Sequence, residues 1–182
     1  METKKSTLFS LSWPIYIELL FIMLLGVADT LMLSQYSDLS VAAVGNGKEV
    51  SKLFVVILSV ASVGVGVVVS QYLGAGDIFQ AKKAMKTGIF GNILIAFVLV
   101  VFIQIFAPYI FEIINTGPEI YSDALLYLRV VSLGFLFLAA TQASSFGFKA
   151  FGHPKVVMYI VGGMNIVNVI LNALLIFGLG PF

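Results

Sequence analysis

The sequence predicts an all-α, polytopic membrane protein, and three observations lead to this fold class. Of 182 residues, 60% are hydrophobic and only 10% are charged, whereas a soluble domain carries roughly 25% charged residues. The mean hydropathy is +1.07. Several apolar runs reach the ~20 residues that a helix needs to cross a hydrocarbon core of ~30 Å. These runs are long and continuous, unlike the short alternating strands of a transmembrane barrel.

Composition also excludes several classes of function. The net charge is +1 and the lysines cluster in loops, so the chain offers no basic patch for a nucleic acid. No cysteine is present, which removes disulfide and thiolate chemistry. His153 stands alone beside Pro154, so we expect it to have no catalytic or metal-binding role. Because the sequence shows no nucleophile–base pair or metal cluster, we expect neither an enzyme nor a cofactor.

The first of five predicted helices covers residues 8–33. Trp13 and Tyr36 lie near its two ends, where aromatic side chains favour the membrane–water interface. Lys4 and Lys5 precede it as they would in a signal peptide, but the apolar run is too long and contains two acids. We therefore expect a retained first membrane helix.

The second helix is predicted to begin between Val41 and Leu53, because the polar residues at 46–49 obscure its start. It is expected to end at 74–77, where glycines interrupt the apolar pattern. Small residues at i, i+4 and i+8 predict that one of its faces packs closely against another helix. These residues are Ser62, Gly66 and Ser70.

The third helix is predicted over about 78–107. Asp77 and Gln80 have the spacing of a capping box, in which an N-cap side chain accepts from the third backbone N–H of the helix. Pro108 is expected to end it, because proline lacks the N–H that a helix interior requires.

The fourth and fifth helices complete the pattern. The fourth is predicted over about 118–147, opening at Pro118, since proline is favoured in a first helical turn. The fifth is predicted over about 155–177, and the glycines and proline at 178–181 are expected to stop it. We therefore expect about five transmembrane helices in a lipid bilayer.

The placement of lysines predicts the orientation of these helices. Cytoplasmic loops of membrane proteins carry an excess of lysine and arginine, and the lysine-rich segments fall in alternate loops. We therefore expect a protein of the plasma membrane, with a cytoplasmic N-terminus and an external end after the fifth helix. The lysines on the predicted cytoplasmic side are Lys4, Lys5, Lys82, Lys83, Lys86, Lys149 and Lys155.

Two acids in the first helix are unexpected in lipid. Glu18 and Asp29 are eleven residues apart, so they differ by only ~20° around the helix and share a face with Pro14. Ionisable groups inside membranes almost always face the bundle interior or a water-filled cavity. Glu18 is close enough to Trp13 to reach the interface or cap a neighbour. Asp29 lies ~24 Å past Trp13, with Arg129 the only basic candidate at similar depth, and we predict that Asp29 is functional.

The fifth helix carries three asparagines on one face, Asn165, Asn168 and Asn172. Interhelical hydrogen bonding is a common use of asparagine in bilayers, at ~0.6–2 kcal/mol per contact, and it is the favoured explanation for Asn165. Counted from Lys155, Asn168 and Asn172 lie ~20 and ~26 Å along the helix. Because both helices start on the same side, these two residues lie at the depth of Asp29.

A carboxylate with two amide carbonyls is a suitable oxygen cage for a hard cation such as Na⁺. The same carboxylate, removed from water, is able to carry a proton instead. The residue pattern does not decide between Na⁺ and H⁺. No metal site is predicted beyond a possible Na⁺ site at Asp29, Asn168 and Asn172.

Nearly the whole chain resembles the N-terminal part of the multidrug and toxic compound extrusion (MATE) transporters. The order and spacing of several segments carry the resemblance. They are SWPIYIELLFIMLLGVADTLML, VAAVG, SQYLGAGD, YLRVVSLGFLF and FGHPKVVMYIVGGMNIVNVILNALLIFGLGPF.

The resemblance implies two six-helix lobes around a central cavity and exchange of Na⁺ or H⁺ for organic, often cationic and aromatic, compounds. It implies that Asp29 couples the cation together with Asn168 and Asn172. Many members have an aspartate in place of Asn172, so the resemblance does not decide between Na⁺ and H⁺. Pro14 matches a proline proposed to bend the first helix, and Glu18 matches no family site.

Length is the main departure from the family. Residues 1–182 are expected to form an incomplete N-terminal lobe, without its sixth helix or the second lobe, which would be its partner. The leading hypothesis is therefore a partial secondary active antiporter for multidrug efflux. A lipid-linked oligosaccharide flippase or polysaccharide exporter of the same superfamily is a second hypothesis, although Arg129 is the only cationic residue available to line its cavity. A nonfunctional membrane fragment is a third.

Overall fold

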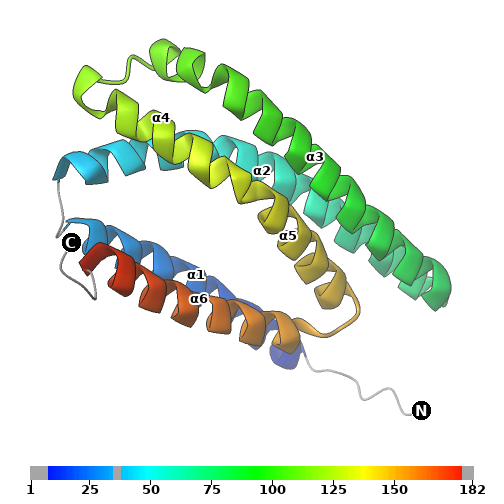
Figure 1. Cartoon of the computed structure of the whole chain (residues 1–182). Coiled ribbons are helices and arrows are strands. Elements are labelled where there is room, and N and C mark those ends of the chain that lie inside the picture. Colours follow the sequence, from blue (N-terminus) through cyan, green and yellow to red (C-terminus); the bar gives the residue numbers. More distant parts are fainter. Residues whose placement is uncertain (1–7, 35–37, 178–182) are drawn as a thin grey trace. The chain divides into compact units, whose positions relative to one another are not determined.

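A computed structural model of the chain describes residues 8–34 and 38–177 (Figure 1). Within these ranges the chain forms helices joined by short turns, and no strand occurs. Tyr36 and the stop signals at 178–181 lie outside the described residues. The helices are α1 (Leu8–Ser34), α2 (Asp38–Gly74), α3 (Ile78–Ile113), α4 (Pro118–Leu133), α5 (Phe135–Ala150) and α6 (Pro154–Phe177).

The lengths and composition of these helices confirm an all-α, multi-spanning membrane protein. In the described residues, α1, α2, α3 and α6 are each long and apolar enough to cross a bilayer, and α4 with α5 makes a fifth candidate span. The predicted limits of the first and last helices agree with α1 and α6 to within one residue. Asp77 is the N-cap of α3, as predicted, and its Oδ1 accepts from the Gln80 backbone N–H at 2.9 Å.

The prediction of one continuous helix over 118–147 is wrong. The chain forms α4 and α5, which are bent by 48° at Gly134. At the bend, Gln104 of α3 donates its Nε2 to the Arg129 carbonyl at 2.9 Å and to Ser132 Oγ at 3.1 Å. The Ser132 hydroxyl also donates to the Arg129 carbonyl, at 2.8 Å. Side chains that enter the backbone hydrogen-bond ladder are a recognised cause of sharp helix kinks.

Two predicted helix limits also need correction. Pro108 does not end α3, which continues to Ile113, because helices in membranes tolerate proline where neighbouring groups satisfy the freed backbone. Helix α2 begins at Asp38, before the predicted interval, and contains the polar residues at 46–49. Gly47 explains part of this polar run, since a Cβ there would lie 2.4 Å from the Tyr127 ring of α4. Only glycine permits that approach.

The chain divides into two compact units, each of which is described by itself. A four-helix unit comprises α2, α3, α4 and α5, and a two-helix unit comprises α1 and α6. In the four-helix unit, apolar side chains such as Leu58, Ile103 and Phe135 form a buried core. Asn92 of α3 joins three helices within it, donating its Nδ2 to Ser62 Oγ of α2 at 2.7 Å and to the Ala139 carbonyl of α5 at 2.9 Å.

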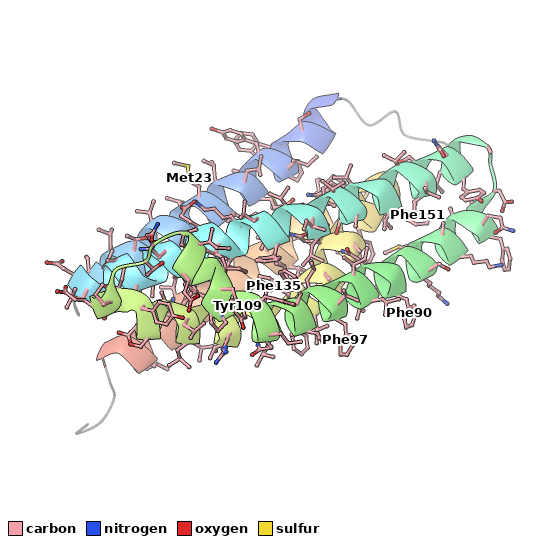
Figure 2. The ribbon with its side chains drawn as sticks, turned by 90° about the horizontal axis from the view of Figure 1, so that it is seen from above. Met23, Phe90, Phe97, Tyr109, Phe135 and Phe151 are labelled. Atoms are coloured by element: carbon pink, nitrogen blue, oxygen red, sulfur yellow. The ribbon has the colours of Figure 1, made fainter. Side chains whose placement is uncertain are left out.

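In the two-helix unit, α1 and α6 lie side by side and run in the same direction (Figure 1). Gly162 of α6 meets the Phe21 ring of α1, where an added Cβ would lie 3.0 Å from a ring carbon. Many large apolar side chains are exposed on both units, and Figure 2 shows Phe90 and Phe97 pointing outward from α3. Exposed apolar faces of this kind are suited to lipid hydrocarbon, in which apolar surface carries no penalty.

Candidate functional site

The two-helix unit brings together side chains from distant parts of the sequence. Asp29 lies 21 residues past the start of α1, and Asn172 lies 18 residues past the start of α6. At ~1.5 Å per residue these positions are at comparable heights along two helices that run in the same direction. Asn168 precedes Asn172 by four residues, which places it on the same face one turn earlier.

These three side chains form one hydrogen-bonded cluster, which we call the Asp29 cluster. Asn172 donates its Nδ2 to Asp29 Oδ1 at 2.7 Å and to Asn168 Oδ1 at 2.9 Å. The bond to the acid is the shorter of the two. Asp29 and Asn172 are half-buried, and Asn168 is exposed. The three residues selected from the sequence therefore lie together, and their role in cation coupling stays a prediction.

The Asn172 amide is turned so that its NH₂ group, and not its oxygen, faces the other two side chains. One carboxylate oxygen and one amide oxygen converge on a single point, and the NH₂ group of Asn172 lies there. The positive end of an amide dipole thus holds the position that a cation would take. Rotation of the Asn172 amide by ~180° about its last side-chain bond exchanges this donor for a carbonyl acceptor. Such a rotation would place a third oxygen where the donor now lies.

The charge of the Asp29 cluster limits what it can bind. Asp29 contributes the only carboxylate, and the other two side chains are neutral. Among the described residues, no three His, Cys, Asp or Glu side chains lie together in a way that suits a metal ion. A single negative charge balances one monovalent cation or one proton, which agrees with Na⁺ or H⁺ better than with a divalent ion.

The other predicted site residues of α1 lie away from the cluster. Pro14 is fully buried inside α1, and Glu18 is only 6% exposed. Glu18 precedes Asp29 by eleven residues, which is ~16 Å along a helix, so it is not a fourth member of the cluster. Its burial argues against a side chain extended into the interface. The hinge role of Pro14 and the function of Glu18 stay predictions.

Asn165 lines an apolar cavity that sequence reasoning missed. The cavity, of about 370 Å³, runs between α1 and α6. The Nδ2 atom of Asn165 is buried and makes no hydrogen bond within the described residues, so the interhelical bond expected for it is not found there. The Gly162–Gly163 pair was the only local signal, because small residues in a membrane helix mark close helix packing. The lining includes Phe21, Leu25, Ala28, Gly162, Asn165 and Val169.

Two further polar residues lie outside this cluster. Arg129 belongs to α4 in the four-helix unit, and its Nε is buried without a hydrogen bond in the described part of the chain. His153 is exposed in the turn before α6. The described side-chain partner of Asp29 is Asn172.

Comparison with known proteins identifies relatives over almost the entire chain. The MatE family model matches residues 14–174. The sequence is 37% identical over 180 residues to the uncharacterized transporter YisQ of Bacillus subtilis, covering 98% of this chain and 39% of that protein. It is 30% identical over 181 residues to the probable multidrug resistance protein NorM of Thermotoga maritima. This match covers 96% of this chain and 38% of that protein.

A solved structure supports the same fold. A transporter of the MOP superfamily from Pyrococcus furiosus, described as having a binding pocket of reverse polarity, matches with a TM-score of 0.83. The match is 22% identical and covers 93% of this chain and 38% of that one. The chain thus spans about two fifths of the length of the relatives it matches.

Proposed function

Because the chain belongs to the MatE family of membrane transporters, we propose that it is the N-terminal part of a secondary active antiporter. The transporter exports organic, often cationic compounds in exchange for Na⁺ or H⁺. MATE transporters are not enzymes, and transport is the activity proposed for the protein that contains this chain. Its site is the plasma membrane, with the N-terminus in the cytoplasm.

The Asp29 cluster is the observation that carries this proposal. A carboxylate far along a membrane helix costs at least ~2.5–3.5 kcal/mol on insertion scales, so its presence needs a compensating role. Asn172 satisfies only one of its oxygens in the described residues, and Asp29 is half-buried. An acid that is held in place yet accessible is suited to take up and release a cation.

The coupling step follows from the hydrogen bonds of Asn172. A Na⁺ ion or a proton that binds Asp29 neutralises the carboxylate. The 2.7 Å hydrogen bond from Asn172 then becomes weaker, because such a bond is stronger to an ionised acceptor. Asn172 then turns its carbonyl toward the ion or releases Asp29 altogether. Since Asp29 is on α1 and Asn172 is on α6, the change alters how these two helices hold together. Pro14 is the proposed point at which α1 bends in response.

The apolar cavity beside the cluster supports an organic substrate. It includes Ala28 and Val169, which are the neighbours of Asp29 and Asn168 in sequence. Its walls are apolar and partly aromatic, as in most small-molecule pockets, and the NorM relative is named for multidrug resistance. Alternating access requires one repeat to rock against another around a shared site. The remaining part of the transporter is therefore the proposed partner of this chain.

Substitution of Asp29 tests the proposal. In a complete transporter containing these residues, Asp29→Asn removes the charge while it preserves shape and one carbonyl oxygen. We expect loss of gradient-driven efflux of a cationic dye from liposomes, with membrane insertion intact. Glu49→Gln is the matched control, since Glu49 is an exposed acid paired with Lys52. Undiminished efflux by Asp29→Asn under Na⁺ and pH gradients would remove the proposed coupling role.

A lipid-linked oligosaccharide flippase or polysaccharide exporter of the same superfamily is the second candidate. Arg129 is the observation in its favour, because a buried Nε without a described partner is suited to an anionic group. Transport of an anionic lipid-linked sugar that is lost in Arg129→Gln, with no dye efflux in the wild type, would favour this candidate. If neither substrate moves in a complete, folded transporter, the polar residues serve only to pack helices.

A further inference from the structure

A second cavity lies within the four-helix unit. It has a volume of about 560 Å³ between α2 and α5, and we call it the lysine groove. Its walls change in character along its length. One part is apolar, with Val63, Val67 and Phe146, and the other part is polar, with Ser70, Gln71 and Lys149.

Glycine contacts define how this groove is built. Gly66 of α2 faces Phe146 of α5 so closely that an added Cβ would lie 3.2 Å from the Phe146 Cβ. The two helices therefore come close at this point, and both residues line the groove. On another face of α5, Gly147 meets the side chain of Met85 of α3. This contact places Lys149 near the level of the first turns of α3, which carry Lys82, Lys83 and Lys86.

The charge in the groove is held near its apolar part. The Lys149 ammonium lies 5.4 Å from the centre of the Phe146 ring, and Lys149 is half-buried. Ser70 and Gln71 add hydrogen-bond donors in the last turn of α2. A plain hydrocarbon chain would make no electrostatic contact with the ammonium, and a small inorganic anion would make no contact with the apolar wall. An anion that carries an apolar chain uses both parts.

We propose that the lysine groove binds an anionic phospholipid. One acyl chain lies along Val63 and Val67, and the phosphate lies at Lys149. Ser70 and Gln71 donate to phosphate or ester oxygens. Basic pockets between membrane helices are suited to such headgroups, and the three lysines that begin α3 add positive charge at the same end of the unit.

Native mass spectrometry of a complete transporter containing these residues tests the proposal. The probes are phosphatidylglycerol and phosphatidylcholine with identical acyl chains. We expect tighter binding of phosphatidylglycerol, and about fivefold weaker binding in Lys149→Gln, the factor expected for one lysine near an anionic lipid. Lys52→Gln is the matched control, because it removes the same charge from an exposed ion pair with Glu49 and should leave binding unchanged.

Two more variants keep the test decisive. Lys149→Arg retains the charge and should bind phosphatidylglycerol like the wild type even if Lys149→Gln fails to fold. Val67→Phe fills the apolar part of the groove and should weaken binding without any change in charge. Equal binding of the two lipids, or an equal effect of Lys149→Gln and Lys52→Gln, would overturn the proposal. So would displacement of the lipid by an organic cation alone, because it would make the groove a substrate site.

Discussion

The two units differ in how far their hydrogen-bonded polar side chains are exposed. In the four-helix unit, Asn92 is 2% exposed and its amide joins Ser62 to the Ala139 carbonyl. In the two-helix unit, the Asn172 amide joins Asp29 to Asn168, but all three side chains are at least partly accessible. The same amide chemistry thus holds helices together in one unit and keeps an acid available in the other. Accessibility, and not the residue type, separates a structural asparagine from a candidate transport residue.

The apolar surfaces of the units show the same difference. In the most apolar stretches of α2 and α3, 33% and 22% of the residues are buried within the chain, against 6% and 11% in those of α1 and α6. Fewer side chains of α1 and α6 are thus packed within the chain, and packing contacts are what hold helices together in a membrane. We expect substitutions in the four-helix unit to change mainly stability, and substitutions in the Asp29 cluster to change mainly ion dependence.

The largest effect on stability is expected from Asn92→Ala. The change removes two hydrogen bonds and leaves the Ser62 hydroxyl and the Ala139 carbonyl without this donor. The loss should be about 1–3 kcal/mol, the usual penalty for a buried group that loses its partner. Thermal unfolding in detergent measures it. Efflux per folded transporter should keep its dependence on Na⁺ or pH, and a changed ion dependence would contradict the division between the units.

A smaller effect on stability, but a clear one on coupling, is expected from Asn172→Asp. The substitution places a second carboxylate beside Asp29, where two charges ~4 Å apart interact by ~4 kcal/mol at an effective dielectric constant of 20. If Na⁺ is the coupling ion, its binding relieves this repulsion, so its affinity should rise. We expect a gain of about fivefold or more, because desolvation offsets part of the repulsion energy. If H⁺ is the coupling ion, the pH optimum of efflux should move upward.

Asn165→Asp is the comparison for this reversal, and only the dependence on Na⁺ and pH is compared, because Asn165 lines the proposed substrate cavity. It introduces the same charge on the same helix, about two turns from Asn172 and outside the hydrogen-bonded cluster. Dye efflux from liposomes is compared over a series of Na⁺ concentrations and of pH values. The same shift in both variants would mean that any acid in this region acts alike, and the specific role of the Asp29 cluster would be lost.

The smallest effect is expected from Asn168→Ala. This residue accepts one hydrogen bond from Asn172, at 2.9 Å, and carries no charge. Loss of one interhelical or local polar contact in a membrane typically costs ~0.6 kcal/mol, or about a threefold weakening of ion binding. Half-maximal ion concentration for efflux is the measurement. A complete loss of coupling, equal to that of Asp29→Asn, would show that Asn168 has a greater part than its single contact indicates.

The sequence by itself determined the features that depend on neighbouring residues along the chain. Apolar length located α1 and α6 closely, and helical periodicity placed Asn168 and Asn172 on one face. Depth along the two helices selected Asp29 as their companion, and the structure brings these three side chains together. Hydropathy and periodicity are local properties, because each is set by residues within a few turns of one another.

Only the tertiary structure decided the features that depend on contacts between distant residues. The break at Gly134 accompanies hydrogen bonds from Gln104, which belongs to another helix. Gly47 is required by the ring of Tyr127, and the lysine groove by the approach of Gly66 to Phe146. Asn172 presents its NH₂ group to Asp29 because two oxygens from different turns and helices converge there. No local pattern encodes such meetings, since the partner that sets the geometry lies tens of residues away.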